Sequence, residues 1–142
     1  MIFKILGSVT VLLCGALYAK NAQKGVGEEL FEAEYLLELF GYLKNETEEF
    51  DTPLYTVLKS RGIDGGIEGL VEKVRCEKLR AAVVDAKKLG RCYKKEELRI
   101  CNRILSNLEN EKKRLETKAK EIKVMSRVKG LGTAAAAVIL LL

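Results

Sequence analysis

All charged residues but one lie in the middle of this chain. All 20 acidic residues and 24 of the 25 basic residues lie between Lys20 and Lys129, whereas residues 5–19 and 130–142 carry no charge. The average of 48% apolar residues therefore conceals two unlike populations, a polar middle and two apolar ends. With 142 residues, the chain has the length of about one domain, which argues against a multi-domain enzyme.

The first apolar end, residues 1–19, contains one charged side chain, Lys4. As a helix it would span about 28 Å, close to the hydrocarbon thickness of a bilayer. Lys4 is near enough to its end to reach the interface, and Tyr18 with Lys20 would lie at the opposite interface. This pattern predicts an N-terminal transmembrane anchor. The alternative is a cleaved secretory signal, but Leu17 stands where such a signal has a small side chain.

The second apolar end, residues 130–142, is apolar on all faces but would span only about 20 Å as a helix. Extending it back to Val124 adds Arg127 and Lys129, whose long side chains can reach the interface. We predict a second membrane segment here, and the alternative is a C-terminal helix buried against the core.

Basic residues beside both segments predict the orientation of the chain. They are Lys20 and Lys24 after the first segment and Lys118, Lys120, Lys123, Arg127 and Lys129 before the second. The middle, residues 20–129, is therefore expected to be a cytoplasmic domain, with both termini on the other side of the membrane.

The middle has a helical period throughout. Residues 28–51 form an amphipathic pattern with a net charge of −8, and its apolar face is expected to include Leu30, Ala33, Leu36, Leu37, Phe40, Leu43, Thr47 and Phe50. Thr52 and Pro53 then predict a helix start, with Thr52 as N-cap and Pro53 as the first helical residue. Gly62 is expected to end this helix.

Residues 67–89 continue the helical period, with an expected irregularity near Cys76 and a stop at Leu89-Gly90. Their expected core residues are Ile67, Leu70, Val71, Val74, Leu79, Ala82, Val83, Ala86 and Leu89. A last helix starts near Lys94 or Lys95 and is expected to run without a break at least to Gly130. Its heptad-like seam is Leu98, Cys101, Leu105, Leu108, Leu115, Ala119 and Ile122, interrupted by Lys112.

Charge is unevenly divided along the middle, because residues 73–129 carry a net charge of +11 after the acidic helix. Pairing of the acidic helix with the basic segment predicts an antiparallel helical bundle. Together with the apolar ends, the expected fold is all-α, with this bundle flanked by N-terminal and C-terminal transmembrane helices. Membrane lipid is a further expected partner of the basic end, through attraction to anionic headgroups. Nucleic acid is not expected, because no recognition motif accompanies the charge.

Several classes of chemistry are excluded by composition. The chain has no His, which removes Ser-His-Asp, Cys-His and His-Cys zinc sites. The four Cys are too far apart for a tight ligand pair, and the turn at residues 62–66 has no following Lys-Ser or Lys-Thr to bind phosphate. Acidic neighbours such as Glu96 and Glu97 are interpreted as a solvated face. We therefore predict no catalytic, cofactor-binding or metal site, and no enzyme.

The order of these features resembles a known family. Its landmarks are, in order along the chain, a start MIFKILGSVTVLL, a basic exit at Lys20, a Leu36-Leu37-Glu38-Leu39 helix, a Thr52-Pro53-Leu54 step, a Leu89-Gly90 stop and an ending Val128-Lys129-Gly130-Leu131-Gly132 before VILLL. Together they resemble stage III sporulation protein AB of endospore-forming bacteria over the whole chain. The chain departs from that family in a shorter middle around residues 62–66 and in Asn21-Ala22-Gln23-Lys24-Gly25 where an Arg-Pro-rich segment is expected.

The resemblance implies a function and a location. Members are similar to the F-type platform proteins of type II secretion, so it implies a non-enzymatic platform in the mother-cell membrane at the engulfed forespore. The implied partners are the other stage III A-operon membrane proteins and a secretion-type ATPase, and a homo-oligomer is also considered. Thr52, Pro53 and Leu54 are carried over as a structural landmark and a candidate partner surface. The alternative is a membrane-tethered helical adaptor with no part in sporulation.

Overall fold

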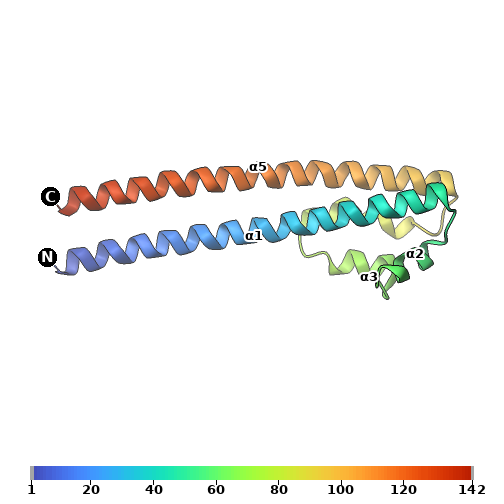
Figure 1. Ribbon diagram of the computed structural model, residues 1–142, viewed down its shortest axis with the longest axis horizontal. Helices are drawn as coiled ribbons and strands as arrows, with labels where there is room; N and C mark the ends of the chain where they lie inside the picture. The colour runs from blue at the N-terminus through green and yellow to red at the C-terminus, as the bar shows by residue number, and fades with distance from the viewer. Residues whose placement is uncertain (1, 142) are drawn as a thin grey trace. The chain divides into compact units, whose positions relative to one another are not determined.

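The protein is all-helical over the part described by the structure, a computed structural model. It describes residues 2–141, apart from the side chains of residues 2–6, 8, 11, 55, 134, 137, 138, 140 and 141. Along the chain lie α1 (Ile2–Glu49), α2 (Leu54–Ser60), α3 (Gly66–Lys73), α4 (Glu77–Val83), the 3₁₀ helix η1 (Val84–Lys88) and α5 (Lys94–Leu141), as Figure 1 shows. The all-α prediction is confirmed, since no strand occurs among these residues.

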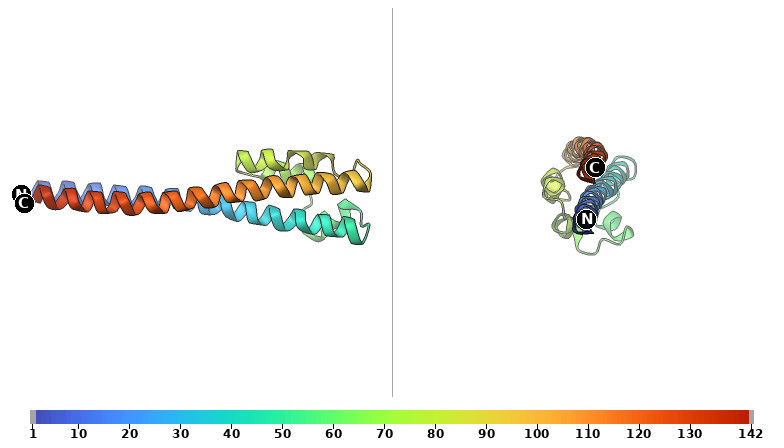
Figure 2. Two further views of the ribbon diagram at one scale, coloured as in Figure 1. Left: turned by 90° about the horizontal axis from the view of Figure 1, so that it is seen from above. Right: turned by 90° about the vertical axis from the view of Figure 1, so that its left-hand side faces the viewer.

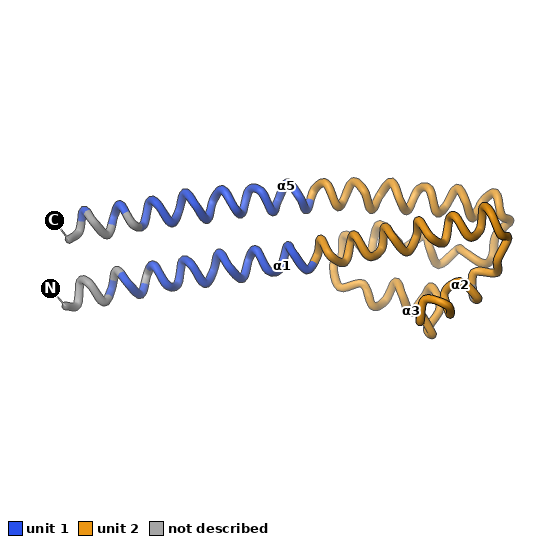
Figure 3. The backbone as a smooth tube through the Cα atoms, viewed as in Figure 1, with its two compact units in different colours: residues 1–28, 115–142 blue, residues 29–114 orange. Residues whose placement is uncertain are grey.

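The chain divides into two compact units (Figure 3). Unit 1 comprises residues 1–28 and 115–142, and unit 2 comprises residues 29–114. Both α1 and α5 contribute to each unit. The domain boundaries predicted after residues 19 and 129 rest on the change in apolar composition along the chain. The division into two units does not test them, and they stay predictions.

Unit 1 pairs a segment of α1 with an antiparallel segment of α5. The covered side chains recur every three or four residues, as in a coiled coil: Ala19, Ala22 and Val26 on α1 and Leu115, Ala119, Ile122 and Ser126 on α5. The amide of Gln23 donates a hydrogen bond to the Ser126 hydroxyl at 3.5 Å, so these two residues lie beside each other in the pair. The predicted seam of the last helix is thus confirmed at its unit 1 positions.

Unit 2 places the short elements α2, α3, α4 and η1 beside segments of α1 and α5 (Figures 1 and 2). Its largest fully buried side chains are Leu36, Phe40, Leu43, Leu79, Val83, Ile104 and Leu108. All nine core residues predicted between Ile67 and Leu89 are buried. Phe50, predicted on the apolar face of the first helix, is 66% exposed, because α1 ends at Glu49 and Asp51 turns the chain with φ 54°.

The start of α2 differs from the prediction. Pro53, with φ −59° and ψ 132°, is the N-cap, and α2 begins at Leu54. The Thr52 hydroxyl donates instead to a carboxylate oxygen of Glu46 at 3.4 Å, so its role as N-cap is wrong. The predicted stop at Gly62 is confirmed: this glycine has φ 72°, and the N–H groups of Gly62 and Ile63 donate to the carbonyls of Lys59 and Leu58 in a Schellman arrangement.

The predicted irregularity near Cys76 is a break between α3 and α4. Val74 and Cys76 have extended backbone, with ψ 119° and 120°. The Glu32 carboxylate of α1 accepts hydrogen bonds from the N–H groups of Arg75 at 2.8 Å and Cys76 at 3.2 Å. A side chain of one helix therefore satisfies the donors that the break leaves without helical partners.

Acidic residues of α1 pair with basic residues elsewhere in unit 2, in part as predicted. Glu34 pairs with Lys112 of α5 at 3.2 Å, and Glu38 pairs with Arg61 at 3.5 Å. Lys112, which interrupts the predicted seam, therefore forms an ion pair with the acidic helix α1. The seam itself also uses Ile100 and Ile104, which the prediction omitted.

The membrane predictions concern the ends of α1 and α5. Within the described part of the chain, no helix has a stretch both long enough and apolar enough to cross a membrane. The segments at 1–19 and 130–142, on which those predictions depend, lie partly outside the described residues. α5 does continue past Gly130, as expected, to Leu141.

Candidate functional site

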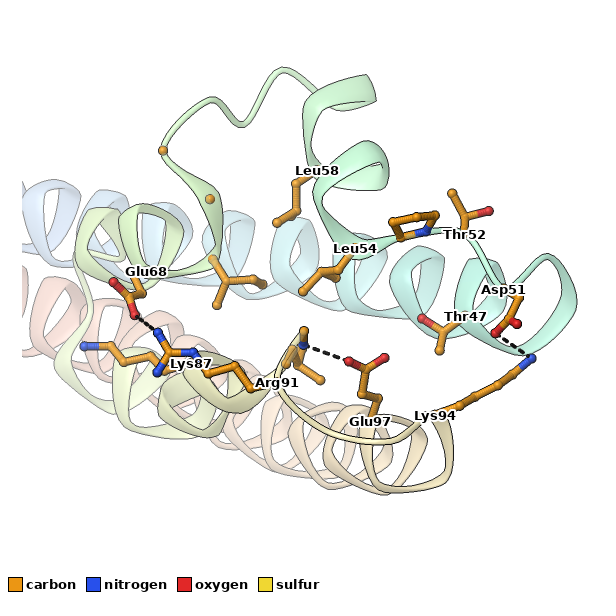
Figure 4. A pocket seen from close by; sticks show the side chains of 16 residues that line it. Thr47, Asp51, Thr52, Leu54, Leu58, Glu68, Lys87, Arg91, Lys94 and Glu97 are labelled. Atoms are coloured by element: carbon orange, nitrogen blue, oxygen red, sulfur yellow. Dashed lines mark hydrogen bonds and ion pairs between the residues drawn. The ribbon is translucent and has the colours of Figure 1, made fainter.

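An open pocket lies within unit 2, between α2, the start of α3 and the segment that leads into α5 (Figure 4). Its volume is about 650 Å³. Leu54, Leu58, Ile67 and Leu89 supply its apolar surface, and three of them are at least nine-tenths buried. The half-buried side chain is Leu54, which points into the pocket (Figure 4).

Two glycines shape the wall of this pocket. Gly66 has φ 65° and Gly90 has φ 82°, a region that side chains disfavour. A Cβ on Gly90 would lie 3.4 Å from Cδ2 of Leu54, so the backbone at Gly90 closes on that side chain. The N–H of Gly90 donates to a carboxylate oxygen of Glu97 at 2.8 Å, which fixes the turn against the first turns of α5.

Charged side chains form the rim of the pocket. Arg91 pairs with Glu68 at 3.2 Å, and Lys94 pairs with Asp51 at 3.2 Å. Both pairs are drawn as dashed lines in Figure 4. All four side chains are well exposed, between 45% and 78%, so each pair contributes about 0–1 kcal/mol and opens at little cost. An apolar pocket with an openable charged rim is suited to binding an apolar side chain of a partner.

Two groups near this part of unit 2 have displaced pKa values. The hydrogen bond from Lys88 holds the pKa of Asp85 below its usual 3.8 against the opposing effect of burial, and Arg103 adds to the lowering. Burial raises the pKa of the Cys101 thiol to about 11, and the carboxylate of Glu97 adds to the rise. Cys101 is therefore a protonated core side chain near neutral pH. Among the described residues, no group of His, Cys, Asp and Glu has the geometry to hold a metal ion.

The predicted landmark Thr52, Pro53 and Leu54 lines this pocket, as do Gly65-Gly66 and Leu89-Gly90. Three features that are separate in the sequence thus meet at one place. Glu68, Arg91 and Glu97 also line it and were not predicted as site residues. Glu97 was interpreted as part of a solvated face, and no sequence signal relates it to Gly90, because their contact depends on how the chain turns into α5.

The predicted membrane-proximal basic residues all lie in unit 1, where Lys20, Lys24, Lys123, Arg127 and Lys129 are exposed. Lys24 is 4.0 Å from Glu28 on the same helix. Because Gln23 lies beside Ser126 and both helices rise about 1.5 Å per residue, Lys20 lies level with Lys129 and Ala19 level with Gly130. The bases from the two helices therefore form one basic collar, which consists of Lys20, Lys24, Lys123, Arg127 and Lys129.

Exposed apolar side chains lie on the terminal side of the basic collar in unit 1. Leu13 and Leu17 are 59% and 61% exposed on α1, and Leu131 and Ile139 are each 74% exposed on α5. Thr133 satisfies its hydroxyl internally by donating to the Lys129 carbonyl at 2.8 Å. Contiguous apolar patches on a surface are typical of membrane and partner contacts.

Comparison with known proteins gives no relative for this chain: no family model, no curated protein and no solved structure matches it.

Proposed function

We propose that the protein is a non-enzymatic membrane platform of the sporulation transenvelope complex, working in the mother cell beside a secretion-type ATPase. The apolar ends of α1 and α5 would anchor it in the membrane around the forespore, and unit 2 would be its cytoplasmic part. Its partners would be the other stage III A-operon membrane proteins. The observation that carries the proposal is that two landmarks of the resemblance, Thr52-Pro53-Leu54 and Leu89-Gly90, line the same pocket.

That meeting supports the resemblance in a specific way. Each landmark by itself is an ordinary helix boundary, and helix boundaries do not have to converge. Here the Thr52-Pro53-Leu54 step and the Leu89-Gly90 stop lie side by side, since a Cβ on Gly90 would be 3.4 Å from Cδ2 of Leu54. A platform needs a surface that a partner can recognise, and a pocket with an apolar floor and weakly paired rim charges provides one.

The membrane part of the proposal is supported by unit 1. With Gln23 beside Ser126, the uncharged segments 5–19 and 130–141 lie on the same side of the basic collar. Exposed apolar residues on that side, such as Leu17 and Leu131, would then be covered by lipid instead of water.

Co-purification tests the proposed role of the pocket. The full chain with Leu54→Glu, expressed in sporulating cells, is expected to lose the ATPase and its companion membrane proteins, because a carboxylate would enter the apolar floor. Val84→Glu is the matched control, since Val84 is an apolar residue of unit 2, is 51% exposed and does not line the pocket. Equal recovery of partners with both variants would contradict the role of the pocket.

Two further measurements test the placement and the biological role. A reporter that is active only in the cytoplasm is expected to work when inserted near Gly65 and to be silent at the carboxyl terminus. Deletion of the gene is expected to block sporulation after engulfment while growth stays normal. A normal spore yield would reject the role in sporulation.

A second candidate function is a membrane-tethered helical adaptor with no part in sporulation. It is favoured by a surface outside the pocket, where Phe31 and Tyr35 lie one turn apart on α1 and are 74% and 46% exposed. The position of the gene separates the two candidates: a sporulation platform is expected next to genes for a secretion-type ATPase and small membrane proteins, and an adaptor is not.

A further inference from the structure

The excess positive charge of the protein lies entirely in unit 1. Residues 1–28 and 115–142 carry eight basic and three acidic residues, which is a net charge of +5 and equals that of the whole chain. Unit 2 carries seventeen basic and seventeen acidic residues and is neutral. The net attraction of the chain to an extended anionic surface is therefore supplied by unit 1.

Within unit 1, the charge is concentrated at one level of the helix pair. Lys20 and Lys24 of α1 lie level with the stretch of α5 that holds Lys123, Arg127 and Lys129, because Gln23 lies beside Ser126. All five side chains are exposed. The two helices are antiparallel, so a single short segment of each supplies the whole collar.

We propose that the basic collar binds the anionic headgroups of a lipid bilayer and selects anionic over zwitterionic lipids. This inference rests on the membrane placement proposed above and adds the chemistry of the lipid. Exposed lysines and arginines beside apolar side chains match a bilayer surface, where phosphate groups lie next to hydrocarbon. A nucleic acid would offer phosphates without an apolar layer, and Leu17 and Leu131 would then stay exposed to water.

Vesicle flotation of the full chain tests this proposal. The probes are vesicles of phosphatidylcholine alone and vesicles in which part of it is replaced by phosphatidylglycerol. The partition coefficient is expected to be higher for the anionic vesicles, and raising the salt concentration is expected to reduce the difference. The triple variant Lys123→Gln, Arg127→Gln and Lys129→Gln should lower the preference by up to about fivefold for each basic residue removed.

The matched control removes the same charge from unit 2 with Lys73→Gln, Lys78→Gln and Lys95→Gln, all exposed in the structure. It should leave the preference unchanged. An equal loss in both variants would show that only net charge matters and would overturn the proposal. Tighter, collar-dependent binding of a short duplex DNA than of anionic vesicles would also overturn it, in favour of a nucleic acid.

The same experiment separates this inference from the proposed membrane anchoring. Equal binding to both kinds of vesicle would overturn lipid selection while supporting anchoring by the apolar ends. Binding to anionic vesicles alone, reversed by salt, would support the collar and reject the anchoring. Failure to bind either kind of vesicle would overturn both.

Discussion

Removal of the Glu32 carboxylate should destabilise unit 2 by a predictable amount. Glu32 on α1 accepts hydrogen bonds from the N–H groups of Arg75 and Cys76 at the break between α3 and α4. Glu32→Ala leaves both donors without this acceptor. Hydrogen bonds to a charged group contribute about 1.5–3 kcal/mol each, and the exposed Arg75 donor can bond to water instead. The expected loss is therefore about 2 kcal/mol, mostly from the part-buried Cys76 donor.

Equilibrium unfolding of the full chain in urea, in a mild detergent and followed by circular dichroism, measures this loss as a lower midpoint with an unchanged slope. Glu32→Gln keeps one carbonyl oxygen as acceptor and should lose about half as much. Glu48→Ala is the matched control, because Glu48 is an exposed acid of the same helix, and its effect should stay within about 0.5 kcal/mol. A midpoint for Glu32→Ala equal to that of Glu48→Ala would refute the bridging role of the carboxylate.

Three other predictions concern the surroundings of the pocket. Gly90→Ala should destabilise the protein by about 1–2 kcal/mol, measured by the same unfolding assay, because Gly90 has φ 82°, which a residue with a Cβ adopts only with strain. Gly41→Ala, on α1 with open space around it, is the control and should be neutral or stabilising. Cys101 should resist alkylation in the native protein while the half-buried Cys92 reacts, because burial raises the pKa of the Cys101 thiol to about 11. Peptide mass spectrometry measures the labelling of each cysteine, and equal labelling of both would contradict this prediction. Asp85 has a lowered pKa, so its contribution to stability is present above the unfolded-state pKa of 3.8 and is lost as pH falls through the folded-state pKa. Asp85→Asn should therefore lower the free energy of unfolding by about 0.5–1 kcal/mol at neutral pH and by less in acid. A loss of stability that does not depend on pH would contradict a stabilising role for the Asp85 carboxylate.

Much of the helical pattern could be predicted from local sequence. The spacing of apolar residues from Ile67 to Leu89 identified nine positions that are all buried, because a three-to-four period has only one way to face a neighbouring helix. Gly62 and Gly90 were also predicted as helix stops, because glycine readily adopts the positive φ at which many helices end, and both residues have a positive φ in the structure. These features depend on the backbone and its nearest neighbours.

The errors arise where tertiary contacts compete with local preferences. Thr52 has a common N-cap side chain, but its hydroxyl bonds to Glu46, six residues earlier. In the sequence, Glu97 looks like any other solvent-exposed acid, because its hydrogen bond from the N–H of Gly90 depends on the tertiary structure. Ile67 and Leu89 were predicted as core residues and Leu54 as part of a landmark, and no periodicity could show that Leu54 and Leu89 line one cavity.

The neutrality of unit 2 has a consequence for the speed of association. Because unit 2 has no net charge, long-range steering of a partner would have to come from local patches of charge, and without a matching patch on the partner the association rate constant should lie near the unsteered range of about 10⁵–10⁶ M⁻¹s⁻¹. That rate should also change little with salt. Concentration of both proteins on one membrane would then replace steering, by reducing a search through the cell volume to a search along a surface.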